Sequence, residues 1–362
     1  MASVGILHCT ACGERLTPDA RFCPRCGAAS TAGADALVGK IIAERYLLTE
    51  KIGQGASGTI YRAEHTTLHR KLAVKILHHQ LSRDEAAVER FRREATTVGQ
   101  IDNDHILQVS DFGRTEDQRL FFAMELLEGE ALDVTLTREQ RMSPDRVAKI
   151  LLQICDALGE AHGLGYVHRD LRPRNVFLAV RRGERDFVKL LDFGLAKLIR
   201  PDAEMRQTAL GMAFGDPRYM SPEQARGDVI DPRSDVYSLG VVAFEMLTGA
   251  APYAGNGPFE VLQKVLDGAI PRVRDTRPDC PAWLDAIVYK AMQKRAEQRY
   301  ATLPQLVQDL RTEAAPPVAA TSVAVPLGVS RAMDLMATPP ALPVYAGAPK
   351  SRTLLMETAL SA

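Results

Sequence analysis

The sequence predicts an α+β protein built from more than one unit. Three observations indicate this class. Two Cys-x-x-Cys pairs lie in the first 28 residues, short β-type segments follow from Arg45, and apolar residues recur at helical spacing over residues 144–163. We expect units at residues 1–28, 44–313 and 314–362, with a linker at 29–43.

Composition bounds the possible functions. A length of 362 residues suits two or three units, and 46% hydrophobic residues allow a sizeable core. Lysine and arginine balance aspartate and glutamate, 45 against 45, which removes any general electrostatic case for nucleic acid or an anionic membrane as a partner. No run of 18 apolar residues indicates a membrane-spanning helix, and the first residues lack a signal-peptide pattern. We therefore expect a cytoplasmic protein.

The four N-terminal cysteines form two matching pairs, each followed by glycine. The two-residue spacer lets both thiolates of a pair face one ion, and the glycine permits the tight turn that aims backbone N–H groups at sulfur. Two such pairs predict a closed, structural Zn²⁺ site, although redox or disulfide pairs are an alternative. A segment this short would draw its folding energy from the metal. The expected ligands are Cys9, Cys12, Cys23 and Cys26.

This segment resembles the small zinc ribbons found at the ends of bacterial regulatory proteins. No strong basic patch with interleaved aromatic residues accompanies the cysteines, so a protein-interaction module is favoured over a nucleic-acid binder. The small, polar stretch Ser30–Asp35 that follows is typical of a linker.

A strand over Tyr46–Ile52 runs into a Gly-x-Gly-x-x-Gly motif at residues 53–58, and β-type residues follow at 59–61. Glycines let a backbone approach phosphates and donate N–H groups without a Cβ clash. In dinucleotide-binding folds this motif opens a helix, whereas the residues that follow here fit a strand–loop–strand hairpin better.

A third strand, Lys71–Leu77, places Lys75 among apolar neighbours. A lysine buried in a strand needs an anionic partner. Glu94 offers one, on a helix that we expect from about residue 84 to residue 100. A Lys75 that snorkels to the surface is the alternative.

The residues with phosphate chemistry come after an expected helix at Pro144–Gly163, which Ser143 and Pro144 would start. Asp170 can accept a proton, and Asn175 and Asp192 are hard oxygen donors of the kind Mg²⁺ prefers. A short β-hairpin, Asn175–Leu178 with Phe187–Leu191, separates the last two. Aspartates that only cap loops are the alternative interpretation.

Taken in order, these motifs resemble those of eukaryotic-type protein kinases of the bacterial Ser/Thr branch, over about residues 44–313. The resemblance implies a two-lobed fold, with a β-rich small lobe at about 44–127 and a mostly helical large lobe at about 128–313. It also implies ATP with Mg²⁺ or Mn²⁺, and transfer of the γ-phosphoryl group to Ser/Thr hydroxyls of protein substrates, with autophosphorylation. The implied ATP-binding residues are Ile52, Gly53, Gln54, Gly55, Ala56, Ser57, Gly58, Ile60, Ala73, Lys75, Met124, Glu125, Leu127 and Phe177.

By this resemblance, Lys75 holds the α- and β-phosphates and Glu94 fixes Lys75, while Asp170 orients the substrate hydroxyl and takes its proton. Asp192 and Asn175 hold the metal ions. Met124 is the gatekeeper at the back of the adenine pocket. His168 packs and hydrogen-bonds and is not a base, Asp235 braces the catalytic loop, and Glu223 pairs with Arg299.

A second Asp-Phe-Gly at residues 111–113 precedes the catalytic loop, and we expect it to form a turn without a metal role. The segment from Asp192 to Glu223 is expected to be the activation segment. Thr208 is its expected phosphosite, with Arg169 as phosphate partner, and a solvated loop threonine is the alternative. The Ala/Pro-rich tail at 314–362 predicts disorder, either with autophosphorylation sites or as an unmodified linker.

The chain departs from the family pattern at two positions that meet in the family near the catalytic aspartate. Arg172 stands where lysine is usual, and Asp216 stands where threonine is usual. Arginine keeps the charge but is planar and bulkier, so we count Arg172 among the catalytic residues and expect it to pair with Asp216. A nucleotide-binding pseudokinase or scaffold is the alternative function. A small-molecule kinase is a weaker one, because the Pro222-Glu223 segment and the Asp235 helix belong to protein-substrate docking.

Overall fold

The computed structural model describes residues 7–8, 12, 14–16, 24–27, 35–55, 58–79, 101–191 and 216–314. Seven of the expected site residues lie outside these ranges, as do the expected helix at 84–100 and the tail from residue 315. The seven residues are Cys9, Cys23, Ala56, Ser57, Glu94, Asp192 and the proposed phosphosite Thr208.

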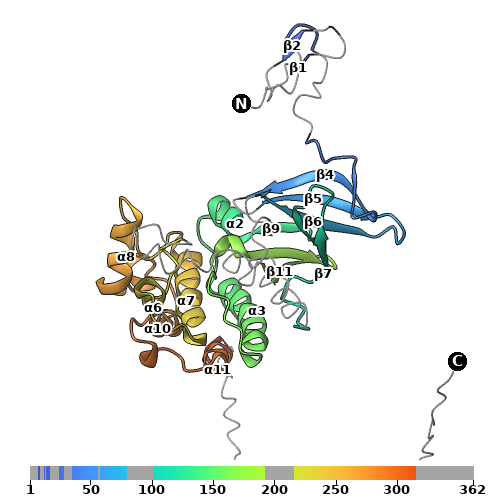
Figure 1. The fold of residues 1–362 in the computed structure, drawn as a ribbon. Helices are drawn as coiled ribbons and strands as arrows, with labels where there is room; N and C mark the ends of the chain where they lie inside the picture. Colours follow the sequence, from blue (N-terminus) through green and yellow to red (C-terminus); the bar gives the residue numbers. More distant parts are fainter. Residues whose placement is uncertain are drawn as a thin grey trace, which may run out of the picture. The chain divides into compact units, whose positions relative to one another are not determined.

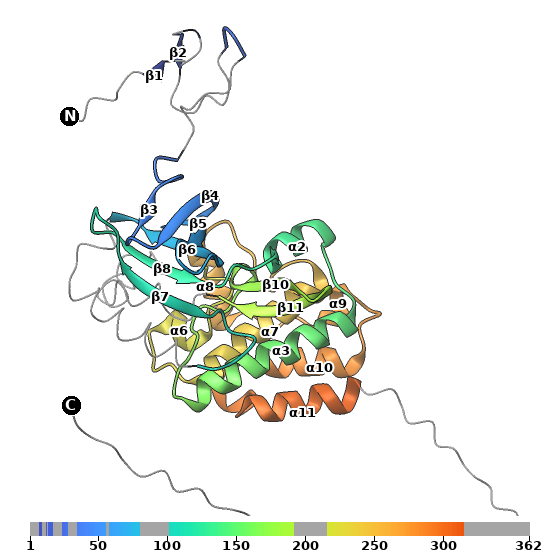
Figure 2. The same cartoon turned by 90° about the vertical axis from the view of Figure 1, so that its right-hand side faces the viewer.

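The small lobe contains a six-stranded antiparallel sheet in the order β3-β4-β5-β6-β8-β7 (Figures 1 and 2). The three strands expected around the glycine motif are confirmed. The strands are β3 (Ile41–Ile42), β4 (Tyr46–Gln54), β5 (Gly58–His65), β6 (Lys71–Leu77), β7 (Val109–Arg114) and β8 (Leu120–Met124). A separate two-stranded pair, β1 (Leu7–His8) with β2 (Arg15–Leu16), lies among the N-terminal cysteines.

One face of this sheet carries a hydrophobic cluster that includes Leu48, Tyr61, Val74 and Phe121, each at most 2% exposed. Alternation along a strand sends every second side chain to this face. Ile42 joins the cluster at 5% exposure, and Leu37 and Ala43 pack against it.

Residues 35–43 are therefore part of the small lobe. The prediction of a linker at 29–43 is wrong for this stretch, because its apolar side chains complete the sheet's core.

Residues 111–113 correct a second expectation. They lie within strand β7 and do not form a turn. The Asp111 carboxylate accepts hydrogen bonds from Arg45 Nη2 at 2.7 Å and from the Tyr46 hydroxyl at 2.6 Å. This Asp-Phe-Gly therefore ties the sheet edge to the start of β4, because its carboxylate is occupied by an arginine and a phenol.

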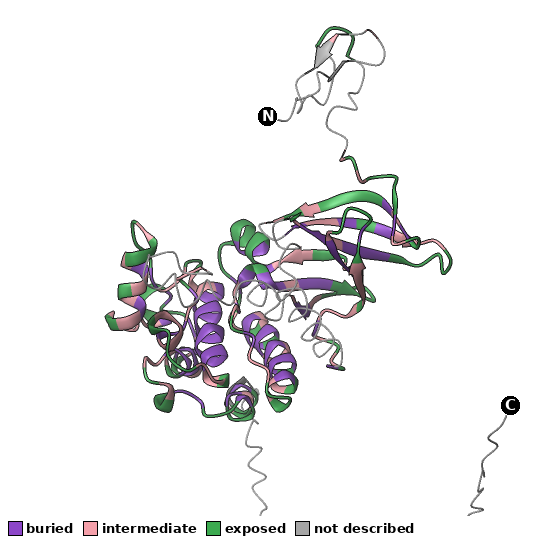
Figure 3. Cartoon of the chain, viewed as in Figure 1, coloured by how far each residue is buried: buried purple, intermediate pink, exposed green. Residues whose placement is uncertain are grey.

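The large lobe is mostly helical, as the resemblance implies, and α3 and α7 form its buried centre (Figures 2 and 3). The helices are α2 (Leu132–Glu139), α3 (Pro144–Gly163), α6 (Pro222–Arg226), α7 (Pro232–Thr248), α8 (Pro258–Asp267), α9 (Val273–Thr276), α10 (Ala282–Ala291) and α11 (Leu303–Ala314), with 3₁₀ turns η3 (Pro173–Asn175) and η4 (Ala296–Gln298).

Helix α3 begins at the expected residue. The Ser143 side chain accepts a hydrogen bond from the backbone N–H of Arg146, and Pro144 needs no N–H partner at the first helical position. Its apolar residues at helical spacing, such as Val147, Ile150 and Leu151, are buried. Among the described helices, none combines the length and the apolar character that crossing a bilayer requires.

The large lobe also contains a three-stranded sheet in the order β11-β10-β9, in which β10 and β11 form the expected hairpin. Its strands are β9 (Gly129–Ala131), β10 (Val176–Arg181) and β11 (Glu184–Leu190). Strand β11 also meets the segment before β7, because Leu190 bonds through its backbone to His105 and Leu107. These strands place residues 170–191 against both lobes.

Candidate active site

The catalytic loop holds Asp170 and Asn175 against each other. The Asn175 amide Nδ2 donates to the backbone carbonyl of Asp170 at 2.8 Å and to its carboxylate Oδ2 at 2.9 Å. These two bonds fix the asparagine side chain and leave its Oδ1 without a hydrogen bond among the described residues. An amide oxygen held in this way is a suitable metal ligand, so the donor set fits Mg²⁺.

Asp235, at the start of α7, is fully buried and supports this loop from behind. Its two carboxylate oxygens accept the backbone N–H groups of His168 at 2.8 Å and Arg169 at 2.9 Å. His162, at the end of α3, adds a third contact from its Nε2 at 2.7 Å. Arg169 has a φ of 64°, so this network holds the loop in a conformation that a non-glycine residue rarely adopts.

His168 is completely buried. Its Nε2 lies 3.2 Å from the Leu191 carbonyl, and its Nδ1 accepts the backbone N–H of Asp170 at 3.3 Å. The ring therefore links the catalytic loop to the residue just before Asp192, which suits a packing and hydrogen-bonding role.

The expected pair between Arg172 and Asp216 is wrong. Asp216 pairs with Arg218, whose Nε lies 2.9 and 3.1 Å from the two carboxylate oxygens. Arg172 Nε instead lies 3.4 Å from Asp170 Oδ2. The physical reason is proximity in sequence, since Arg218 reaches a carboxylate two residues away with little loss of chain entropy.

The negative charge of Asp216 is balanced by Arg218 instead of Arg172. Burial opposes ionisation of its carboxyl, but the hydrogen bonds and charge of Arg218, with a smaller contribution from Arg172, lower its pKa. The added carboxylate is therefore neutralised locally, and Arg172 stays beside Asp170.

Strands β4, β5 and β6 assemble the nucleotide-binding residues expected from the glycine motif. Gly55 and Gly58 exchange backbone hydrogen bonds, 2.9 Å in one direction and 3.3 Å in the other, which closes the turn between β4 and β5. Lys75 stands opposite Ile60 on one side and Phe122 on the other. The lysine is thus at the centre of the sheet, directly across from the strand that leaves the glycine motif.

Gly58 is required by a close approach of two strands. A Cβ at this position would lie 2.2 Å from the Ile76 carbonyl oxygen and 2.9 Å from the Leu77 Cα, both backbone atoms. Gly58→Ala should therefore push β5 away from β6 and destabilise the protein by about 1–3 kcal/mol. Thermal unfolding and ATP-binding assays measure the two effects. The unfolding temperature and the affinity for ATP should both fall.

The matched control for this prediction is Gly55→Ala. No atom lies within 4 Å of a Cβ at Gly55, so its unfolding temperature should stay close to that of the wild type. Equal unfolding temperatures for the two variants would contradict the steric explanation.

The segment after β8 has the features of an adenine-binding hinge. Met124, the expected gatekeeper, is buried at the end of β8. In the described part of the chain, no hydrogen bond engages the carbonyl of Glu125 or the amide of Leu127. An acceptor and a donor two residues apart, both available, fit the edge of an adenine ring.

The Glu125 side chain is anchored away from that edge. Its Oε1 accepts the Gln108 backbone N–H at 2.9 Å and the ammonium of Lys189 at 2.6 Å. Lys189 is buried on β11 and also donates to the Ile106 carbonyl at 3.3 Å. This ion pair joins the hinge to the strand that leads to Asp192.

Three of the apolar residues among the expected ATP-binding residues come from different strands. Ala73 on β6 stands opposite Met124 and is 4% exposed. Ile60 lies on β5 and Phe177 on β10, both half-buried. Ile52, another expected ATP-binding residue, lies on β4 and is 42% exposed. Whether they contact a nucleotide stays a prediction.

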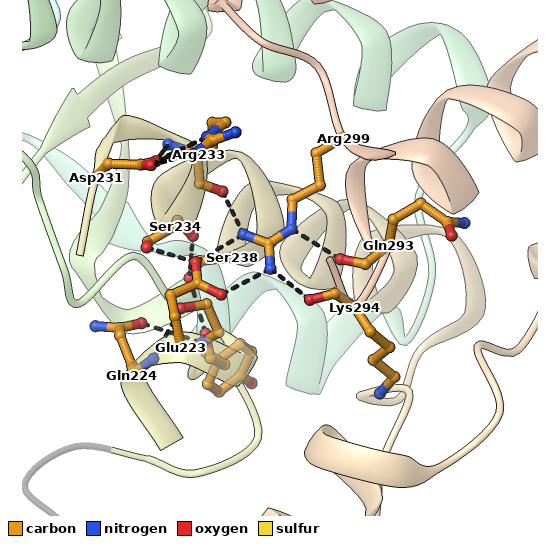
Figure 4. A network of polar contacts seen from close by, with 11 residues as sticks. Glu223, Gln224, Asp231, Arg233, Ser234, Ser238, Gln293, Lys294 and Arg299 are labelled. Carbon is orange, nitrogen blue, oxygen red and sulfur yellow. Dashed lines mark hydrogen bonds and ion pairs between the residues drawn. The ribbon is translucent and has the colours of Figure 1, made fainter. Parts of the chain in front are cut away.

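Glu223 and Arg299 form a buried ion pair in the large lobe (Figure 4). Arg299 Nη1 and Nη2 each lie 2.7 Å from a Glu223 oxygen, and Arg299 also donates to the carbonyls of Arg233, Gln293 and Lys294. Burial by itself would raise the pKa of the Glu223 carboxyl, but Arg299 and the Ser234 hydroxyl outweigh it and lower the pKa to about 2.

Sequence reasoning missed three residues of this site: His162, Lys189 and Gln224. Gln224 Nε2 donates to the Arg169 carbonyl at 2.8 Å while Gln224 also forms a capping box with Ser221. The Ser-x-x-Gln pattern could have indicated that cap. His162 and Lys189 are polar residues in apolar surroundings, a signal that gives no partner without the tertiary structure.

Of the four zinc ligands expected, Cys12 and Cys26 lie within the described residues and Cys9 and Cys23 outside them. No group of three or more His, Cys, Asp or Glu side chains suited to a metal gathers among the residues that the structure describes. The four-cysteine site therefore stays a prediction.

Comparison with known proteins follows the same division of the chain. A family described as "Protein kinase domain" matches residues 46–310, and one described as "zinc-ribbon domain" matches residues 8–30. The crystal structure of the Mycobacterium tuberculosis PknI kinase domain matches with a TM-score of 0.60 and 25% identity, over 77% of this chain and all of that one.

Curated relatives include serine/threonine-protein kinases pkn3 and Pkn1 of Myxococcus xanthus. They are 38% and 37% identical over 82% of this chain, which covers 56% and 44% of their lengths. A probable serine/threonine-protein kinase PknB of Lactococcus lactis is 33% identical over 76% of the chain and 43% of its own length. The chain thus spans about half the length of these relatives, and it belongs to the protein kinase family with a catalytic domain like those of bacterial serine/threonine kinases, preceded by a zinc-ribbon segment.

Proposed function

We propose that this protein transfers the γ-phosphoryl group of ATP to Ser/Thr hydroxyls of proteins, itself included. The observation that carries the proposal is the catalytic loop, in which Asp170 is held by Asn175 and the loop backbone by buried Asp235. Relatives named as serine/threonine kinases support the acceptor class.

Each group has a defined task in this proposal. One oxygen of Asp170 is occupied by Asn175, and the carboxylate can orient a substrate hydroxyl and accept its proton. Lys75 would hold the α- and β-phosphates and Glu94 would fix Lys75. When bound, Mg²⁺ neutralises phosphate charge, and Asn175 Oδ1 with Asp192 would hold it.

The rival pseudokinase interpretation depended on Arg172 and Asp216 disabling the site. Arg172 remains beside Asp170, and Arg218 neutralises Asp216. The cation that the family places near the γ-phosphate is thus kept, which favours turnover. The decisive experiment incubates the purified protein with ATP and Mg²⁺ and maps the phosphopeptides, and a protein that gains no phosphate would contradict the proposal.

Thr208 is proposed as the regulatory phosphosite, with Arg169 as the partner of its phosphate. Thr208→Ala should lower the transfer rate about tenfold or more, which is the worth of one charge-assisted hydrogen bond. Kinetic assays of the variant beside the wild type measure this. Full activity together with an unchanged autophosphorylation pattern would show that Thr208 is only a solvated loop residue.

The N-terminal segment is proposed to bind one structural Zn²⁺ through Cys9, Cys12, Cys23 and Cys26 and to serve as a protein-interaction module. The zinc-ribbon match over residues 8–30 supports the metal. The neutral overall charge supports a protein partner over nucleic acid.

A further inference from the structure

The residues just before the first long strand form a clasp on the small lobe, which we define as residues 35–43. Asp35 is its first residue and has three partners among the residues that the structure describes. Its Oδ1 accepts the Leu37 backbone N–H at 3.1 Å, and its Oδ2 accepts the Tyr61 hydroxyl at 2.8 Å and lies 3.7 Å from Lys51 Nζ. One carboxylate thus joins the clasp to both β4 and β5.

The clasp acts on the part of the hairpin whose pairing is irregular. Strands β4 and β5 shift register twice, between Leu48 and Glu50 and again between Lys51 and Gly53. Such irregularities bend a hairpin and leave backbone groups without ladder partners. The clasp holds the other edge of β4 beside the first shift, because the backbone of Leu48 bonds to Gly39 at 2.8 Å and to Lys40 at 2.9 Å.

Asp35 supplies the support at the second shift. Lys51 and Tyr61 stand opposite each other in the ladder, two residues before Gly53 on one strand and three after Gly58 on the other. Lys51 Nζ also donates to Gln54 Oε1 at 2.8 Å, within the glycine motif. Burial and the neighbouring Asp35 raise the pKa of Tyr61 to about 12, which is consistent with a hydroxyl that donates to this carboxylate.

We propose that Asp35 is a positioning residue for nucleotide binding: through Tyr61 and Lys51 it holds the glycine-rich hairpin in the shape that receives the phosphates. Asp35 lies on the opposite face of the sheet from Lys75, because Ile60 stands opposite Lys75 and its neighbour Tyr61, the partner of Asp35, points to the other face. This inference rests on the proposed ATP-binding function.

The test is a double-mutant cycle in the full chain. Asp35→Ala, Tyr61→Phe and the double variant are compared for the Kd of Mg-ATP, measured with a fluorescent ATP analogue, and for thermal unfolding. Each single change should raise the Kd of Mg-ATP about three- to tenfold, which is the worth of one hydrogen bond. The Kd of the double variant should be no higher than that of the more weakly binding single variant. Asp35→Asn keeps an acceptor for Tyr61 and should restore most of the affinity.

The control is Glu50→Ala, which removes an exposed ion pair with Arg62 on the same hairpin without touching the clasp. Its Kd should equal that of the wild type. A lowered unfolding temperature with an unchanged Kd in Asp35→Ala would show that Asp35 has only a structural role. A double variant whose loss of affinity is the product of the two single losses would show that Asp35 and Tyr61 act independently. Either outcome overturns the proposal, as does an equal loss in Glu50→Ala.

Failure of the proposed function gives a different result. A wild-type protein that binds Mg-ATP but transfers no phosphate would refute the kinase activity and leave the Kd comparison valid. A wild-type protein that does not bind Mg-ATP would refute both.

Discussion

Asp170→Asn is expected to lower the rate of phosphoryl transfer by about 10²- to 10⁴-fold, the usual contribution of a positioned proton acceptor. The amide keeps the size of the carboxylate and can still accept the hydrogen bond from Asn175 Nδ2. It can no longer take a proton, so the Kd of ATP should change little while kcat falls. Radiolabelled ATP assays with a nucleotide titration separate the two quantities.

The matched control is Asp267→Asn, an exposed aspartate at the end of α8 whose activity should equal that of the wild type. Retention of more than about a tenth of the activity by Asp170→Asn would rule out Asp170 as the proton acceptor. The result would also bear on Arg172, because its Nε lies 3.4 Å from Asp170 Oδ2.

Arg299→Gln is expected to destabilise the protein by about 3–5 kcal/mol, because it leaves the Glu223 carboxylate buried without its cation. Arg299 also bonds three backbone carbonyls, which lose their donor in the variant. Equilibrium denaturation measures the change. Arg138→Gln, at an exposed pair with Glu130, is the control and should leave the midpoint nearly unchanged.

The same pair predicts a dependence on pH. Because the folded-state pKa of Glu223 is about 2, against an ordinary value of 4.5, its contribution is complete above pH 4.5 and is lost as pH falls toward 2. The stability difference between wild type and Arg299→Gln should therefore shrink over that interval. A difference that is independent of pH would show that the backbone carbonyls, and not Glu223, account for the effect.

The fold and much of the site could be predicted because their signals are local. The β-type residues around the glycine motif located β4, β5 and β6, and the Ser143-Pro144 start located α3. The order of motifs from Gly53 to Asn175 identified the family, which the matches then showed.

Three expectations failed where a distant or competing partner decided the outcome. Asp111 was expected in a turn, yet its carboxylate pairs with Arg45 and Tyr46 and its segment completes a sheet. Asp216 was expected to pair with Arg172, but it forms its ion pair with Arg218, and Arg172 lies beside Asp170. Residues 35–43 follow the small, polar stretch Ser30–Asp35 and were expected to belong to the same linker, but they cover the sheet's core.

The sequence by itself determined the chemistry of this protein, because Asp170, Asn175 and the glycine motif derive their meaning from residue type and order along the chain. Only the tertiary structure decided how those groups are held. Asp235 with His162, Lys189 with Glu125, and Asp35 with Tyr61 join residues from 26 to 73 positions apart. Such pairings are set by how helices and strands pack in three dimensions, and no local pattern records them.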